Sequence, residues 1–150
     1  MTAPPAPGRL LYQIEIDAPP DEVWRAITEP ELTPRFFHDT AVHTSWSPGA
    51  PISYDLPDGT PAIVGRIVEY TPPRRFVMTA TFLFDAEATA EPESLVTWEV
   101  KPDGRGTLLT LLHDRVPPRT ISLVRGGWPG ILEDLHRTLR PGAEPTVVAS

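Results

Sequence analysis

The chain has 150 residues, 40% of them hydrophobic and 22% charged, which is the size and apolar content of one globular domain. Its 20 acidic residues outnumber its 13 basic ones, and the formal net charge of -7 excludes a basic surface for nucleic acid or for an anionic membrane. Without cysteine, disulfides, thiolate nucleophiles and cysteine-based zinc sites are also excluded. We expect a cytoplasmic protein, because no run of about 18 apolar residues and no N-terminal signal peptide is found.

Prolines and the composition of the two ends indicate how the chain is divided. Most of the 20 prolines lie between apolar runs, where they mark boundaries between elements. The two ends are rich in Pro, Ala, Gly and Thr and contain little that could be buried. We therefore predict a flexible N-terminus over residues 1–8, one domain over 9–142 and a flexible tail over 143–150.

The N-terminal part predicts one strand and two short helices. Apolar residues alternate over 9–17, which indicates a half-buried strand. Prolines and acidic residues then open a helix near residue 19, as expected for an N-terminal turn. A second helix begins at Pro30, and it should be short or irregular because Pro34 cannot donate a backbone hydrogen bond.

The middle of the chain, residues 42–113, predicts strands joined by turns. Asp58-Gly59 and Asp103-Gly104 separate alternating apolar runs and are typical hairpin turns. The segment 85–94 is acidic and does not alternate, so we predict a solvated loop there.

The C-terminal part predicts one long helix from about residue 119 to 140. Its apolar residues fall on one side of a helical wheel: Ile121, Val124, Trp128, Leu132, Leu135 and Leu139. This phase continues across Pro129, so the helix should bend near 126–129 without losing its buried face. Together the elements predict an α+β domain in which a curved antiparallel sheet wraps around the last helix.

These residues resemble a known family. The segments "IEIDAPPDEVWRAITEPELT", "SPGAPISYDLPDGT", "GRIVEYTPPRRF", "VTWEVKPDGRGTLLTLLHD" and "GGWPGILEDLHRTL" are similar, in this order, to SRPBCC domains of the activator-of-Hsp90-ATPase-homologue type, in the START and Bet v allergen superfamily. The resemblance covers about residues 9–142. It implies a helix-grip fold with an apolar cavity between the sheet and the C-terminal helix. It does not imply one activity, since the superfamily includes lipid carriers, hormone receptors, polyketide cyclases and co-chaperones.

Candidate ligand-binding residues are those that alternation and the helical wheel place beside such a cavity. They are Phe36, Phe37, His38, Trp46, Tyr54, Met78, Trp98, His113, Trp128 and Leu132. For each apolar member taken alone, simple core packing is the commoner explanation. The polar members would give specificity. We expect His113 to offer one imidazole nitrogen to a ligand oxygen while backbone or Asp114 holds the other.

The sequence contains no recognised catalytic, metal-binding or phosphate-binding motif. The four histidines have no metal-ligand spacing, and no nucleophile elbow or phosphate loop is present, so we predict no catalytic residues, metal or cofactor. The main hypothesis is a monomeric or homodimeric protein that binds a hydrophobic, lipid-like or polyketide-like small molecule. The alternatives are a polyketide cyclase or aromatase-like enzyme and a co-chaperone-like protein-interaction module. A cavity near about 300 Å³ would favour the first two, and a filled interior the third.

Overall fold

The computed structural model describes residues 7–150 and contains an antiparallel sheet of eight strands in the order β2-β3-β4-β5-β6-β7-β1-β8. The strands are β1 (Gly8–Ile16), β2 (Ala41–Thr44), β3 (Pro51–Asp55), β4 (Pro61–Thr71), β5 (Arg75–Phe82), β6 (Ser94–Asp103), β7 (Gly106–Val116) and β8 (Val147–Ala149). The helices are α1 (Pro20–Thr28), the 3-10 turn η1 (Thr33–Arg35), α2 (Ala86–Thr89), α3 (Pro118–Val124) and α4 (Gly127–Leu139).

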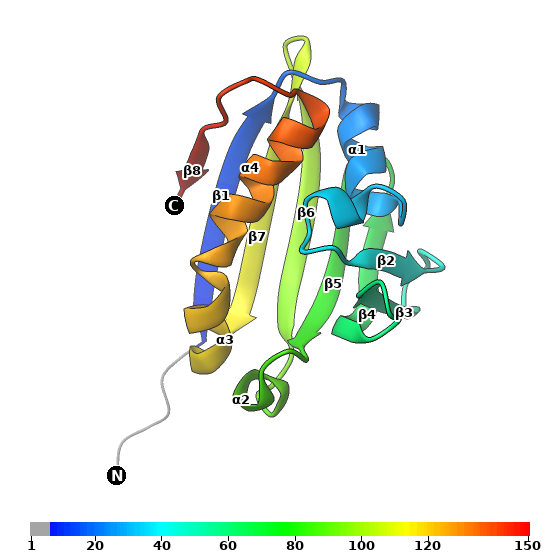
Figure 1. Cartoon of the computed structure of the whole chain (residues 1–150), viewed down its shortest axis with the longest axis vertical. Helices are drawn as coiled ribbons and strands as arrows, with labels where there is room; N and C mark the ends of the chain where they lie inside the picture. The colour runs from blue at the N-terminus through cyan, green and yellow to red at the C-terminus, as the bar shows by residue number, and fades with distance from the viewer. Residues whose placement is uncertain (1–6) are drawn as a thin grey trace.

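The helices lie over one face of the curved sheet. Figure 1 shows α4 running along β1 and β7, with α1 beside it over the middle of the sheet. The short helix α2 lies at the lower end of the molecule, next to α3. The predicted α+β helix-grip architecture is thereby confirmed.

Strand alternation produces this two-layer arrangement. In β1 every second residue from Leu10 to Ile16 is buried, and in β7 the same holds from Thr107 to His113. Because successive side chains of a strand point to opposite faces, one face of the sheet supplies the core and the other meets solvent. The core also contains the predicted stripe of the C-terminal helices, including Trp128, which is 3% exposed.

The long C-terminal helix is interrupted, which differs from the prediction of one bent helix. Both Arg125 and Gly126 keep helical backbone angles, yet the regular element stops at Val124 and resumes at Gly127. Pro129 has no N–H to donate to the carbonyl of Arg125, four residues earlier. The Tyr12 hydroxyl of β1 donates to that carbonyl instead, at 3.1 Å. The proline thus ends one helix, and the sheet supplies the missing hydrogen bond.

Two other segments differ from the sequence-based expectation. The acidic segment 85–94 contains α2, and its Ala88 is buried. In the tail, β8 pairs with β1, with Gln13 opposite Val148, so part of 143–150 is ordered strand. Of the predicted flexible N-terminus, residues 1–6 lie outside the described part of the chain, and Gly8 begins β1.

Candidate functional site

An apolar hollow, here called the outer pocket, opens between the segment after η1, the end of β5 and the junction of α3 with α4. Its volume is about 60 Å³. It is lined by Phe37, His38, Ile63, Phe82, Phe84, Leu123, Val124, Gly127, Trp128 and Ile131. Phe84 is 62% exposed, which places a large apolar side chain at the rim. None of the lining side chains is acidic or a lysine or arginine, so the pocket suits an uncharged apolar group.

A smaller space, here called the inner gap, lies deeper between the sheet and α4. Its volume is about 10 Å³, and it is lined by Phe37, Tyr54, Ile63, Met78, Ala80, Phe82, Val96, Trp98 and Trp128. Four of these residues also line the outer pocket: Phe37, Ile63, Phe82 and Trp128. The two spaces are therefore neighbours that share a wall of mostly aromatic side chains.

Phe37 forms the central part of that shared wall. Its ring centre lies 4.8 Å from that of Tyr54, 5.6 Å from Trp128 and 6.5 Å from Trp98. These are the separations of favourable aromatic pairs. Phe37 therefore fills the space between these three rings.

The backbone that carries Phe37 has an uncommon conformation. His38 and Asp39, which follow it, have φ angles of 49° and 60°, in the left-handed region that is unfavourable for residues other than glycine. The Thr40 hydroxyl donates to the carbonyl of Phe37, and the Phe37 N–H donates to the carbonyl of Thr33 at 2.9 Å. Local hydrogen bonds thus hold a strained turn that directs Phe37 into the core.

A buried chain of hydrogen bonds joins α4 to the sheet behind the inner gap. The indole N–H of Trp128 donates to Nδ1 of His113 at 3.0 Å. With Nδ1 accepting, the neutral imidazole carries its proton on Nε2, which lies 2.7 Å from the Ser94 hydroxyl. Ser94 in turn donates to the carbonyl of Ala80 at 3.2 Å. Every polar group in this chain has a partner, so it fixes the rotamer of Trp128.

The geometry changes the interpretation of His113. Its side chain is fully buried, and burial lowers its pKa to about 4, with the nearby Asp114 carboxylate acting weakly in the opposite direction. Both ring nitrogens are occupied by Trp128 and Ser94, so neither is free for a ligand in this conformation. The predicted Asp114 contact is wrong, because the Asp114 carboxylate accepts from the N–H of Arg115. His113 positions Trp128.

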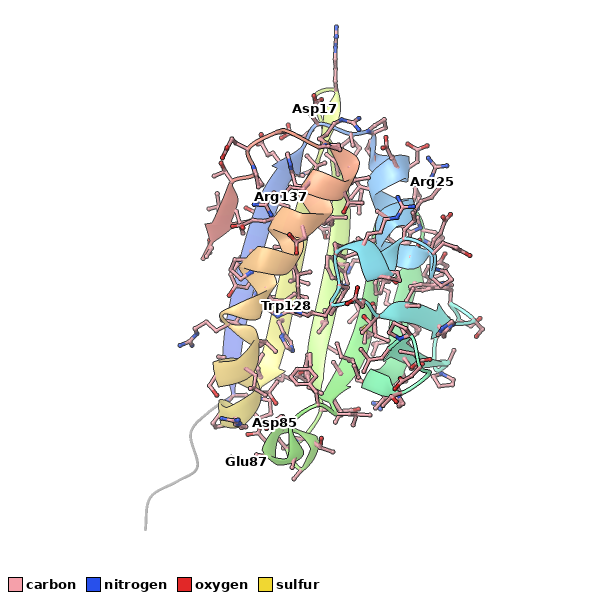
Figure 2. All side chains as sticks on the ribbon, viewed as in Figure 1. Asp17, Arg25, Asp85, Glu87, Trp128 and Arg137 are labelled. Atoms are coloured by element: carbon pink, nitrogen blue, oxygen red, sulfur yellow. The ribbon has the colours of Figure 1, made fainter. Side chains whose placement is uncertain are left out.

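Acidic side chains fasten α2 to α3 at the lower end of the molecule, where Figure 2 labels Asp85. The Asp85 carboxylate accepts two hydrogen bonds from the Arg119 guanidinium, at 2.8 and 3.1 Å, which holds the pKa of Asp85 at about 2. Glu91 accepts from the N–H groups of Arg119 and Thr120, at 2.9 and 2.8 Å, and from the Thr120 hydroxyl. These acceptors satisfy N–H groups at the start of α3 that have no partner within the helix. The segment 85–94, predicted to be a solvated loop, therefore holds α2 against α3 through these hydrogen bonds.

The structure brings together some of the sequence-predicted ligand residues. Phe37, Tyr54, Met78, Trp98 and Trp128 line the inner gap, and His38 lines the outer pocket. Phe36 and Leu132 are buried elsewhere in the core. Trp46, which has a φ of 57°, stacks on Tyr70 with ring centres 5.4 Å apart, and Phe76 lies between it and Trp98. Phe36, Leu132 and Trp46 line neither space.

Several lining residues were not among the predicted ligand residues. Phe84 has a sequence signal, since it continues the inward alternation of Phe82 past the end of β5. Leu123, Gly127 and Ile131 also line the outer pocket and lie on the helices beside the predicted apolar stripe. Ser94 had no local signal, because its partner lies on another strand.

Neither a metal site nor a membrane-spanning helix is found in the described part of the chain. Over residues 7–150, no group of three histidine or acidic side chains is arranged to hold a metal ion. In the same range, no helix has the length and apolar character needed to cross a bilayer.

Comparison with protein families gives one clear match. The model for proteins described as activator of Hsp90 ATPase homolog 1-like matches residues 17–140, which include the outer pocket, the inner gap and the Trp128–His113–Ser94 chain. None of the curated proteins matches the chain significantly.

Similar solved structures support the same fold. CalU16 from Micromonospora echinospora is 27% identical, with a TM-score of 0.70 over 89% of this chain and 76% of CalU16. DynU16, a protein of the dynemicin biosynthetic locus, is 25% identical, with a TM-score of 0.71 over 89% of this chain and 48% of DynU16. The HSP90 activator PFC0360w from Plasmodium falciparum is 19% identical, with a TM-score of 0.71 over 95% of this chain and all of PFC0360w, and that likeness concerns the fold alone.

Proposed function

The chain belongs to the family of activator of Hsp90 ATPase homolog 1-like proteins, and from that premise we propose that it binds an uncharged hydrophobic small molecule at the outer pocket. The observation that carries the proposal is that two neighbouring apolar spaces are separated by the side chain of Phe37, which lines both. The ligand's apolar surface would be removed from water against Trp128, Phe82 and Phe84, which contributes about 25 cal/mol per Å². His113, behind the inner gap, has both ring nitrogens engaged by Trp128 and Ser94, so it is not free to contact the ligand.

Binding requires the wall between the two spaces to move. The outer pocket of about 60 Å³ and the inner gap of about 10 Å³ are small beside ligand sites of roughly 300 to 1,000 Å³. Phe37 is the side chain whose movement would join them, and such a movement would relieve the left-handed backbone of the adjacent His38 and Asp39. The conformation in which Phe37 separates the two spaces is then that of the ligand-free protein.

The filled interior also favours a second candidate function, contact with another protein. Phe84 is exposed at the rim, and Leu123 lies next to it on the surface of the outer pocket. A partner would place an apolar side chain against these two without entering the core. This function needs no movement of Phe37, and that difference separates it from the first.

The test uses N-phenyl-1-naphthylamine, an uncharged probe whose fluorescence increases in apolar surroundings. We compare the wild type with Phe84→Arg, which places a charge at the rim, and with Val68→Arg as the matched control. Both positions are exposed, and Val68 lies on β4 and lines neither the outer pocket nor the inner gap. We expect saturable binding to the wild type and to the control, and at least tenfold weaker binding to Phe84→Arg.

A second variant tests the movement of Phe37. Phe37→Ala joins the two spaces, so it should bind the probe more tightly than the wild type while lowering stability by about 3 to 5 kcal/mol. Absence of saturable binding to all of these proteins refutes the small-molecule proposal. Equal binding to Phe84→Arg and the wild type refutes the location.

A further inference from the structure

The rim of the outer pocket is carried by the connection between β5 and β6, which contains α2. Within residues 84–91, here called the flap, Ala88 is the one buried residue. Phe84 lines the pocket and is 62% exposed, with its ring centre 5.9 Å from that of Phe82. The Asp85 carboxylate accepts from the N–H of Ala88 at 3.0 Å and so caps α2. A segment with so little buried surface is held on the domain mainly by its polar contacts.

Both ends of the flap are anchored to the sheet. Just before it, the Leu83 N–H donates to the carbonyl of Ala62 on β4 at 2.8 Å. Just after it, the Glu93 carboxylate pairs with Arg66, also on β4, at 2.9 Å. The flap therefore lies between two fixed points, which is the arrangement of a loop that can move as one piece while the strands stay in place.

Two carboxylates of the flap fasten it to α3. Asp85 accepts from the Arg119 guanidinium at 2.8 and 3.1 Å, and Glu91 accepts from two backbone N–H groups at the start of α3, at 2.9 and 2.8 Å. The flap contributes Phe84 to the outer pocket, and α3 contributes Leu123. These hydrogen bonds therefore fix the separation of two sides of the pocket.

We propose that the flap opens to admit the ligand of the proposed site and that Asp85 and Glu91 are its latch. This inference rests on the proposed function. The movement of Phe37 enlarges the pocket inward, and the flap controls access from solvent. The Asp85 and Arg119 side chains are 19% and 42% exposed, and ion pairs between partly exposed groups are individually weak. Opening therefore breaks weak surface bonds and leaves the core packed, so a minor open population exists before the ligand arrives.

The first test follows N-phenyl-1-naphthylamine by stopped-flow fluorescence, which gives its association and dissociation rate constants. Glu91→Ala removes an acceptor of the latch and should raise both rate constants about fivefold, because the flap opens more often and closes again over the bound probe. The dissociation constant should then hardly change. Asp134→Ala is the matched control, since it removes an exposed carboxylate that pairs with Arg137 on α4 and lines neither space. It should leave both rate constants as in the wild type.

A second variant locks the flap. The chain contains no cysteine, so Asp85→Cys combined with Arg119→Cys supplies two thiols that one molecule of dithiobismaleimidoethane can join. The cross-linked protein should bind the probe roughly tenfold more slowly than the same protein before cross-linking. Reductant cleaves the central disulfide of the linker and leaves both halves attached, so it should restore fast binding unless the flap is not what moves.

The results separate this inference from the proposed function. Equal rate constants in the wild type, Glu91→Ala and the cross-linked protein overturn the flap and leave the proposed function standing. A loss of affinity in Glu91→Ala without faster association also overturns the flap, because it shows that Glu91 only supports the structure of the site. Absence of probe binding to the wild type and to every variant overturns both.

Discussion

The acid stability of the protein depends on His113, and replacing it with glutamine isolates its contribution. The imidazole is fully buried and accepts from Trp128, and its other nitrogen pairs with Ser94. A glutamine side chain retains one acceptor and one donor and does not titrate. His113→Gln loses packing at every pH, so the informative quantity is the pH dependence of the difference between the two proteins.

The magnitude follows from the two pKa values of the imidazole. In the folded protein the pKa of His113 is about 4, and in the unfolded chain it has its ordinary value of 6.5. Between these values the unfolded chain binds a proton that the folded protein does not, so acid favours unfolding. Above 6.5 the ring is neutral in both states and its titration has no effect. At 1.36 kcal/mol per pH unit, the wild type should lose about 3 kcal/mol from this group between pH 6.5 and 4.

The assay is urea unfolding of both proteins at several pH values from neutral to about 4. The acidic residues and the other histidines titrate in both proteins, and their contributions cancel in the difference. The free energy of unfolding of the wild type should fall toward that of His113→Gln by about 3 kcal/mol over this range. A difference that stays constant would show that the imidazole is solvated and would refute the buried hydrogen-bond chain.

Three further predictions concern stability and are checked by the same unfolding measurement. Gly65→Ala should cost at least about 3 kcal/mol or prevent folding, because a Cβ there would lie 1.8 Å from the carbonyl oxygen of Thr79; Gly126→Ala, where nothing lies within 4 Å, should be neutral or stabilising. Glu91→Ala should cost about 1 kcal/mol, since the first turn of α3 loses its acceptor, and an unchanged stability would show that water replaces it. Trp128→Phe should cost about 2 to 4 kcal/mol by leaving the buried imidazole nitrogen unpaired, whereas a loss below about 1 kcal/mol would contradict that bond.

Local patterns in the chain were sufficient for the architecture. The alternation of β1 and β7 predicts which side chains are buried, because successive residues of a strand point to opposite faces whatever the neighbouring strand is. The apolar phase over 121–139 predicts the buried face of α4 for a similar reason. The family resemblance is confirmed by the match over residues 17–140.

Local patterns did not reveal which of these buried groups meet. Ser94, His113 and Trp128 come from β6, β7 and α4, and their hydrogen bonds depend on strand register and on how α4 docks, neither of which is encoded in any short segment. The same holds for the break at Arg125, where the partner of the freed carbonyl is Tyr12, 113 residues away.

The candidate site also depends partly on local sequence patterns and partly on tertiary packing. Strand alternation predicted Tyr54 and Trp98 beside the cavity, and the helical wheel predicted Trp128 there; these residues line the inner gap. Only the assembled packing decides that Phe37 lies between the outer pocket and the inner gap and that both nitrogens of His113 are engaged behind this gap. Volume and hydrogen-bond satisfaction are properties of several chain segments at once, so they arise only when those segments have packed together.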